Sequence, residues 1–355
     1  MEYLEVDGSQ GEGGGQILRT AVAFSAIQGR PVRVDRIRAG RDAPGLKRQH
    51  VSTLRVLAQV FGGELTGATE GSSVVTFVPG AQRLPSISLD MGTAASITLV
   101  LQAVIPAVAL TRSSLKLSLV GGTDVPWSPT FDYLDRVVQA AYRTVGIRFN
   151  VSAERRGYYP RGGGRVTASI EPCTSLTPLV LTSKGDVPDV RLVSRCGALP
   201  KHVAERQLSA AKEVLEGSGI GIASSELSEE QSDSPGSSIL AYHLDPARFL
   251  GSDGLGARGK PAEEVGRETA ARFVAAARSG AALDANLADM LLPLLSLAPG
   301  PSRVAIPNIT SHLQSGLQLA GQFTGCTWSV EEAKGHAVVA VHPKGEGRGR
   351  PGHNV

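Results

Sequence analysis

Apolar and polar positions follow a fixed order of elements over the first eighty residues. Apolar residues dominate 16–27, alternate with polar ones from Val32 to Ile37, and return every three or four positions from Val51 to Phe61. The first and third patterns are typical of helices, and the second is typical of a strand. Two more strands are expected within 64–78, where apolar residues flank a Glu-Gly turn.

The same order of helix, strand, helix and paired strands returns twice. The copies have elements of similar length, with glycines at the element boundaries, but almost no identical residues. This combination is typical of a structural repeat whose sequence has diverged. We therefore predict three repeated units, at about 1–80, 81–183 and 279–343. The elements expected in the second and third units lie at 94–110, 115–119, 130–144 and on both sides of 157–164, and at 286–298, 304–309, 313–324 and in a hairpin ending near Val341.

Residues 184–278 interrupt the repetition and predict a small inserted α/β domain. Its expected elements are a strand, a helix, two strands and a helix, at 190–199, 204–215, near 220–227 and 238–244, and at 262–278. The Ser-, Glu- and Asp-rich stretch 224–237 is expected to be a mobile loop, and 344–355 a flexible tail. The chain is thus expected to be an α/β (α+β) protein whose large domain comprises 1–183 and 279–343.

One polar residue interrupts the apolar first helix of every unit at a similar depth. Arg19 and Gln102 each precede the following strand by 13 residues, and Asp289 stands a similar distance before its strand. A lone polar residue in such a helix is usually a satisfied core group. A base, an amide and an acid at matching positions predict instead that the three units share a central site.

A glycine-rich stretch, Gly8 to Thr20, precedes and opens the first of these helices. Its glycines let the backbone approach a ligand closely, and a helix N-terminus favours an anion. A tight turn explains the same letters equally well. No Gly-Lys-Ser/Thr follows, and the strand–GxGxxG–helix context is lacking, so the stretch is neither a P-loop nor a dinucleotide site.

Composition and charge narrow the class of protein. Hydrophobic residues make up 41% and charged residues 19% of the chain, as in soluble globular proteins. Its three cysteines are far apart and lack CxxC spacing, so neither a disulfide framework nor a zinc site is expected. Because we find no secretion leader and no run of about 18 apolar residues, we expect a cytoplasmic protein without a membrane partner. Nothing in the pattern predicts an oligomeric state.

Positive charge is concentrated near the N-terminus. Eight Lys or Arg residues lie between Arg30 and Arg55, against Asp35 and Asp42. Either a solvated face or a phosphate-bearing partner accounts for this excess. Four arginines around Tyr158-Tyr159 raise the same two alternatives, RNA contact or a solvated hairpin: Arg155, Arg156, Arg161 and Arg165.

Among seven histidines, His312 has a distinctive setting. It stands where a strand is expected to end and a helix to begin, and functional side chains commonly project from such positions. A helix N-terminus favours a neutral, nucleophilic imidazole and an anion beside it. His312 is therefore a candidate catalytic residue, with a structural histidine as the alternative.

Eight motifs resemble, in order, those of the RNA 3′-terminal phosphate cyclase family. The resemblance covers about residues 3–342 and includes the insert. It implies three units of two helices on a four-stranded sheet, as in the C-terminal domain of translation initiation factor 3, with a thioredoxin-like insert. The motifs are GSQGEGGGQILRT, IRAGRDAPGLKRQH, LVLQAVIPA, VGGTDVP, YYPRGGG, GSDGLGARGK, ANLADMLLP and ITSHLQSG.

The resemblance also implies a reaction. In this family a histidine, matched here by His312, attacks the α-phosphate of ATP and forms a covalent histidine–AMP. AMP then passes to the 3′-phosphate of RNA, and the neighbouring 2′-hydroxyl closes a 2′,3′-cyclic phosphodiester. Arginines and a divalent metal, Mg or Mn, would neutralise the phosphoryl oxygens.

The remaining site residues are carried over by motif. Glu12 and Asp289 match the family's acids near the metal and the phosphates. The residues expected to line nucleotide or RNA phosphate are Arg19, Arg38, Arg41 and Gln49. Those expected to contact ATP are Gln102, Asn286, Leu287, Ala288, Asp289 and Met290.

Two departures and two rival functions remain. Met290 and Ser315-Gly316 replace residues that family members often carry beside the acid and the histidine, which bears on nucleotide affinity. A non-catalytic cyclase-like scaffold in ribosomal RNA processing is one rival, although it would lack the histidine. An enolpyruvyl transferase is another, but it would need about six units.

Overall fold

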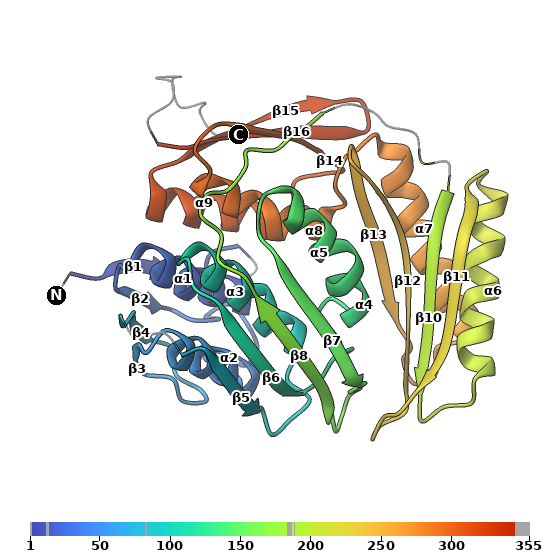
Figure 1. Ribbon diagram of the computed structural model, residues 1–355, viewed down its shortest axis with the longest axis horizontal. Coiled ribbons are helices and arrows are strands. Elements are labelled where there is room, and N and C mark those ends of the chain that lie inside the picture. Colours follow the sequence, from blue (N-terminus) through green and yellow to red (C-terminus); the bar gives the residue numbers. More distant parts are fainter. Residues whose placement is uncertain (1, 12–13, 82–83, 183–186, 188, 345–355) are drawn as a thin grey trace.

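The computed structural model describes residues 2–11, 14–81, 84–182, 187 and 189–344. It is a mixed α/β protein, as the sequence predicts (Figure 1). Within the described residues, the strands form four sheets of four strands each. Glu12 and nearly all of the expected tail lie outside the described residues.

The first sheet and its helices come from the N-terminal part of the chain. Alternating burial along β2 and β4 turns one face of the sheet toward α1 and α2. Strand β1 pairs parallel with β2, and the other pairs are antiparallel. In spatial order the strands are β1 (Leu4–Asp7), β2 (Val32–Asp35), β4 (Val75–Val78) and β3 (Glu64–Thr66), and the helices are α1 (Gly15–Gln28) and α2 (Arg48–Val60).

The second sheet repeats this strand order and these directions. Its second helix runs through three successive segments, α4, η1 and α5, of which the middle one has π-type hydrogen bonding. The strands are β5 (Ser86–Asp90), β6 (Leu115–Gly121), β8 (Gly164–Ile170) and β7 (Phe149–Arg155), and the helical segments are α3 (Ile97–Leu110), α4 (Phe131–Tyr133), η1 (Leu134–Val138) and α5 (Gln139–Thr144).

The third sheet has the same order, but its first strand comes from before the insert. Strand β9 lies in the range predicted for the second unit, yet it pairs parallel with β14. The helix expected at 286–298 begins as α-helix and ends as 3₁₀-helix, since Pro293 has no N–H to continue the α-helical pattern. The elements are β9 (Val180–Leu181), β14 (Ser302–Ile306), β16 (His336–His342), β15 (Thr327–Ala333), α8 (Ala285–Leu291), η2 (Leu292–Leu297) and α9 (Ser311–Thr324).

The fourth sheet corrects the sequence prediction twice. Most of the stretch 224–237 is strand, because β11 extends to Glu230 and β12 begins at Gly236, and only 231–235 form a loop. Strand β13 was not predicted, because the glycines of GSDGLG hide its alternation. Gly251 is needed there, since a Cβ would lie 2.7 Å from the Tyr133 ring. The elements are β11 (Gly221–Glu230), β10 (Asp189–Gly197), β12 (Gly236–Asp245), β13 (Arg248–Leu255), α6 (His202–Gly217) and α7 (Ala262–Ser279).

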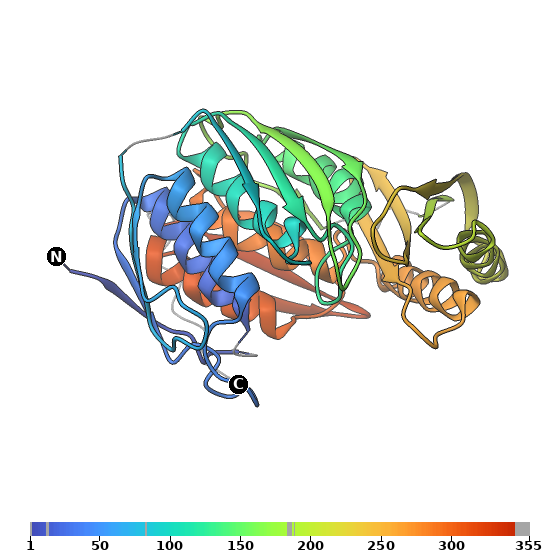
Figure 2. The same ribbon diagram turned by 90° about the horizontal axis from the view of Figure 1, so that it is seen from below.

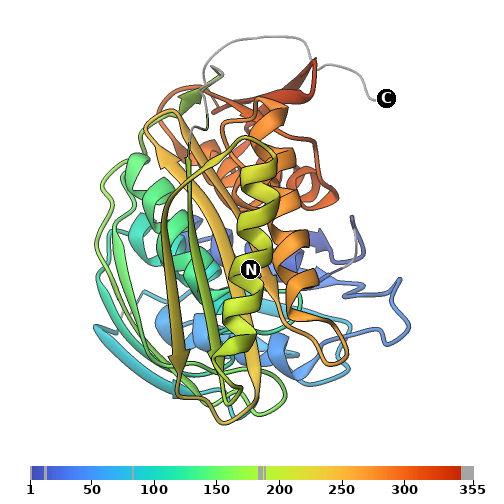
Figure 3. The same cartoon turned by 90° about the vertical axis from the view of Figure 1, so that its right-hand side faces the viewer.

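Helices of the first three sheets meet in the middle of the molecule. Helix α1 packs against α2, α3 and α9, and the sheets lie outside this helical layer (Figure 2). The fourth sheet carries α6 and α7 on its outer side (Figure 3). Its strands alternate between two cores: Leu192 and Ile239 pack beneath α6 and α7, whereas Val193 and Leu240 join the main core. No helix among the described residues has the length and apolar character to cross a membrane.

A buried ion network joins the second and fourth sheets. Asp132 accepts hydrogen bonds from Arg156 Nη2 at 2.9 Å and from Arg195 Nε at 3.0 Å. Arg156 also donates to Asp124 and stacks over Phe131, with its side chain only 5% exposed. Burial alone would lower the pKa of Arg156, but the two carboxylates raise it.

The alternative of RNA contact is therefore wrong for Arg156, whose guanidinium is enclosed by protein. Neighbouring Arg155 is paired with Asp233 of the loop between β11 and β12. Arg155 therefore attaches the second sheet to the fourth through its side chain, and Arg156 does so through its backbone N–H, which donates to the Gln231 carbonyl at 3.2 Å.

Removing the central acid of this network should destabilise the fold. We expect Asp132→Asn to lower the free energy of unfolding by about 3 kcal/mol, because it removes the buried carboxylate that both guanidinium groups share and leaves Arg156 only with Asp124 and Arg195 only with acids that are more exposed. Urea denaturation measures this. The matched control is Glu263→Gln, which breaks the exposed pair with Arg206 and should have a far smaller effect. Equal effects of the two substitutions would contradict this interpretation.

Candidate functional site

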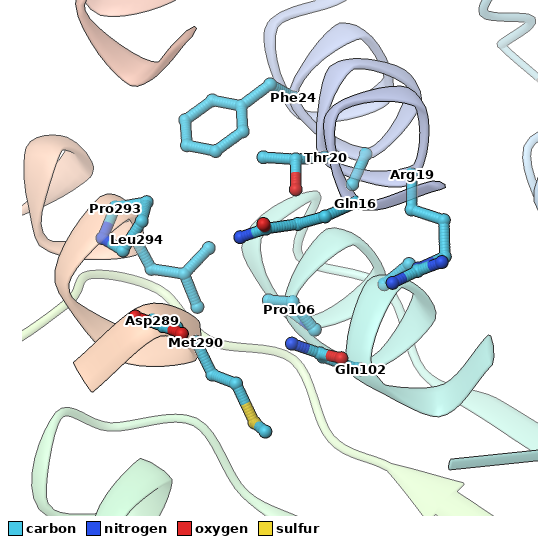
Figure 4. A pocket seen from close by; sticks show the side chains of 12 residues that line it. Gln16, Arg19, Thr20, Phe24, Gln102, Pro106, Asp289, Met290, Pro293 and Leu294 are labelled. Carbon is cyan, nitrogen blue, oxygen red and sulfur yellow. The ribbon is translucent and has the colours of Figure 1, made fainter. Parts of the chain in front are cut away.

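Three predicted residues from the three sheets' first helices line one cavity. Arg19 of α1, Gln102 of α3 and Asp289 of α8 lie around it (Figure 4). Its remaining wall is mostly apolar and comes from the same helices and η2: Gln16, Thr20, Ala23, Phe24, Ala103, Pro106, Met290, Pro293 and Leu294. The cavity has a volume of about 40 Å³, room for little more than a water molecule, so a nucleotide would enter it only if these side chains moved.

Arg19 makes the cavity electropositive on one side. Its side chain is partly buried, and burial lowers its pKa to about 10. Within the part of the chain that the structure describes, Arg19 has no hydrogen-bond or ion-pair partner. A guanidinium withdrawn from water without a carboxylate is costly unless an anion joins it.

Asp289 fixes the start of the helix that carries His312. Thr310 is the N-cap of α9, where its Oγ1 accepts the Leu313 N–H at 2.9 Å. The same hydroxyl donates to Asp289 Oδ1 at 2.5 Å. His312 stands two residues further on, in the first turn of α9. The cavity-lining acid and the histidine are thus coupled through one threonine.

Gln16 provides a second connection, which the sequence analysis missed. Its Nε2 donates to the His312 carbonyl oxygen at 3.1 Å, while its Oε1 is buried without a partner among the described residues. Gln16 precedes Arg19 by one helical turn and lines the same cavity. That spacing, a second polar residue on Arg19's face of an otherwise apolar helix, was the available signal.

The glycine-rich stretch reaches α9 directly. Gly11 has φ of +59°, and a Cβ there would lie 2.1 Å from Ser315 Oγ. Ser315 is buried and donates to the Ser311 carbonyl at 2.7 Å. A Cβ at Gly316 would lie 2.9 Å from Pro293. Ser315 and Gly316, which together are one of the two departures from the family pattern, therefore pack α9 closely against the glycine stretch and η2.

The basic residues after β2 are placed differently from one another. Arg38 is buried at positive φ, and its Nη1 lies 3.5 Å from the Gly45 carbonyl. Burial and the charge of Arg41 lower the pKa of Arg38. Arg41 and Gln49 are exposed, and neither lines the cavity. His50, next to Gln49, is buried with the apolar face of α2.

The run from Asn286 to Met290 divides by helical face. Leu287 and Ala288 are buried in the main core, and Asn286 is exposed. Only Asp289 and Met290 line the cavity. Asp284 caps this helix by accepting the Leu287 N–H, and it also accepts the Tyr133 hydroxyl and the Gly251 N–H. Burial raises the pKa of Asp284 to about 6.

The described residues supply one half of the predicted metal site. No group of three or more His, Cys, Asp or Glu side chains among them is arranged to hold a metal. Asp289 offers one carboxylate at the cavity wall, and Glu12 lies outside the described residues. Mg²⁺ commonly takes one or two carboxylates and completes its shell with phosphate oxygens and water, so this wall fits a metal that arrives with a nucleotide.

Comparisons with known proteins found relatives along nearly the whole chain. The family model described as RNA 3′-terminal phosphate cyclase matches residues 10–330. Proteins named RNA 3′-terminal phosphate cyclase from Thermococcus gammatolerans and Methanopyrus kandleri are 43% and 40% identical. These matches cover 98% and 97% of this chain and the whole of each relative. A third protein of that name, from Thermococcus kodakarensis, is 44% identical over 93% of this chain and 95% of its own.

The match spans most of the chain, including the three helices that line the cavity and the histidine beside it. The chain therefore belongs to the RNA 3′-terminal phosphate cyclase family.

Proposed function

We propose that this protein converts the 3′-terminal phosphate of an RNA to a 2′,3′-cyclic phosphodiester, with ATP as co-substrate and His312 as the nucleophile. One observation supports the proposal most: two side chains of a single cavity hold the turn that carries His312. Asp289 does so through Thr310, and Gln16 through the His312 carbonyl. Such support pre-organises a nucleophile beside its substrate.

The proposed reaction has three balanced steps. A ring nitrogen of neutral His312 attacks the α-phosphorus of ATP, a P–N bond forms, and pyrophosphate leaves with the electrons of the broken P–O bond. An oxygen of the RNA 3′-phosphate then attacks the same phosphorus and displaces the imidazole. Finally the 2′-hydroxyl attacks the 3′-phosphorus, loses its proton, and displaces AMP.

The proposal assigns the charged residues to the phosphates. Arg19 would face the phosphoryl oxygens on which negative charge develops, and Arg38 and Arg41 would extend this positive field. Gln102, Met290 and Asp289 would contact ATP once the cavity that they line has opened to admit it, whereas buried Leu287 and Ala288 offer only their backbone. A divalent metal, Mg or Mn, would neutralise phosphate charge when held by Asp289 and Glu12. Gln49, exposed on α2, would meet RNA rather than ATP.

We further propose that the first three sheets, each with two helices, are repeats of one unit. The shared strand order and directions support this, with β9 assigned to the third unit. Residues 189–279 would then be an insert with its own sheet, α6 and α7. The likeness of this insert to thioredoxin stays a prediction, as does the cytoplasmic location.

Labelling with ATP tests the nucleophile. After incubation with ATP labelled in the α-phosphate and Mg²⁺, the protein should carry an acid-labile label, and His312→Asn should carry none. His202→Asn is the matched control, because His202 is an exposed histidine in the first turn of α6. A labelled His312→Asn protein would refute the assignment.

A cyclisation assay distinguishes an enzyme from a scaffold. An RNA ending in 3′-phosphate should be cyclised and one ending in 3′-hydroxyl should not, whereas a scaffold would act on neither.

Substitution of Arg19, which no described residue pairs, should affect adenylylation without affecting the stability of the fold. We expect Arg19→Met to slow adenylylation on the order of 10²-fold, because it removes a donor to developing phosphoryl charge. It should not lower the urea midpoint, since it also removes a desolvated cation that no described residue pairs. A loss of stability with adenylylation intact would contradict this role. Arg33→Met, at an exposed pair with Glu5, is the control.

A further inference from the structure

A buried histidine outside the predicted set faces the start of α1. His50 lies in the first turn of α2, only 5% exposed. Its Nδ1 accepts the backbone N–H of Lys47 at 3.1 Å. A backbone N–H can only donate, so Nδ1 carries no proton and the ring of a neutral His50 carries it on Nε2. This hydrogen bond fixes both the tautomer and the direction of the ring.

The Nε2–H of His50 points at the N-terminus of α1. A Cβ built on Gly15, the first residue of α1, would lie 2.4 Å from His50 Nε2 and 2.9 Å from Arg19 Nη1. The imidazole, the guanidinium and the first turn of α1 therefore surround one point. Any side chain at Gly15 would fill it.

No described residue satisfies this cluster of donors. Helix α1 has 14 residues, and its N-cap Gly14 makes no side-chain capping hydrogen bond. Within the described part of the chain, His50 Nε2 and the Arg19 guanidinium have no hydrogen-bond partner. Several unpaired donors at a helix N-terminus form a site for an anion.

The surroundings keep His50 neutral. Burial, followed by the positive charges of Arg19, Arg38 and Lys47, lowers its pKa to about 4. A protonated ring would also place a second N–H against the Lys47 N–H. The histidine can thus donate one hydrogen bond at neutral pH without adding another charge to this cluster.

We propose that His50 is a binding residue for a phosphate group of the substrate, which it holds as a neutral Nε2–H donor together with Arg19 and the amide groups at the start of α1. This proposal rests on the proposed function for the identity of the phosphate, which comes either from ATP or from the RNA 3′-end. The anion site itself does not depend on that function.

Two substitutions of His50 test the roles of its two ring nitrogens separately. In His50→Asn the side-chain oxygen can still accept the Lys47 N–H, but no donor reaches the Nε2 position. In His50→Gln the amide nitrogen reaches that position as a donor, while the bond to Lys47 is lost. Arg55→Gln is the control for the general positive field, because Arg55 is an exposed cation on the same helix.

Sulfate binding to the free protein, measured by calorimetry at constant ionic strength, tests the anion site without any catalytic step. We expect His50→Asn to weaken sulfate binding by about tenfold with an unchanged urea midpoint. His50→Gln should bind within a few-fold of the wild type, and Arg55→Gln should match it. Unchanged binding by His50→Asn would overturn the proposal, and so would equal weakening by both variants in step with a lower urea midpoint.

Measurements of KM for ATP and for RNA then identify which substrate supplies the phosphate. A higher KM for ATP in adenylylation of His50→Asn assigns His50 to an ATP phosphate. A higher KM for RNA in the transfer from the preformed adenylate assigns it to the RNA 3′-phosphate. Unchanged values in both arms would overturn the role in the substrate site. If wild-type protein forms no adenylate, the proposed function fails, and sulfate binding still decides the anion site.

Discussion

The hydrogen bond from Thr310 to Asp289 couples the parts of the candidate site. Thr310 starts α9 by accepting the Leu313 N–H, and its proton goes to the carboxylate of α8. Because α8 lines the cavity and α9 carries His312, this bond sets the position of the histidine relative to the cavity. Gln16 and the close contact between Gly11 and Ser315 hold the same helix from the side of α1. The described part of the glycine-rich stretch therefore packs directly against the helix that carries His312.

Charged side chains that are withdrawn from water occur in two different settings in this protein. Between the second and fourth sheets, buried Arg156 and half-buried Arg195 share the carboxylate of Asp132, and the Arg195–Asp132 pair holds the sheets together. Around the start of α1, Arg19 and His50 are withdrawn from water without a described acid beside them. The first arrangement stabilises the fold, whereas the second leaves donors for an anion. A strained or unbalanced cluster of this kind is typical of functional sites.

Helical periodicity predicted the long elements and, through one polar residue in each first helix, the convergence of Arg19, Gln102 and Asp289. The prediction was wrong where the local sequence is compatible with both a strand and a loop. The glycines of β13 predict a loop, but the Tyr133 ring packs so closely on Gly251 that the strand requires glycine there. The polar residues of β11 predict a mobile segment, but they form a strand because they pair with β10. The inward turn of His50 depends on the Lys47 N–H, and the burial of Arg156 on distant carboxylates. The distant carboxylates leave no signal in local sequence, and the reaction itself came from the family resemblance.

The central claim is that His312 receives the adenylyl group. Mass spectrometry of peptides from the protein incubated with ATP and Mg²⁺, kept under conditions that preserve a P–N bond, tests it most directly. The account predicts a single adenylylated peptide, the one containing Thr310 to Gly316, with the added group on the histidine. An adenylyl group on a lysine or on another histidine, or cyclised RNA formed with no modified peptide at any time, would contradict it.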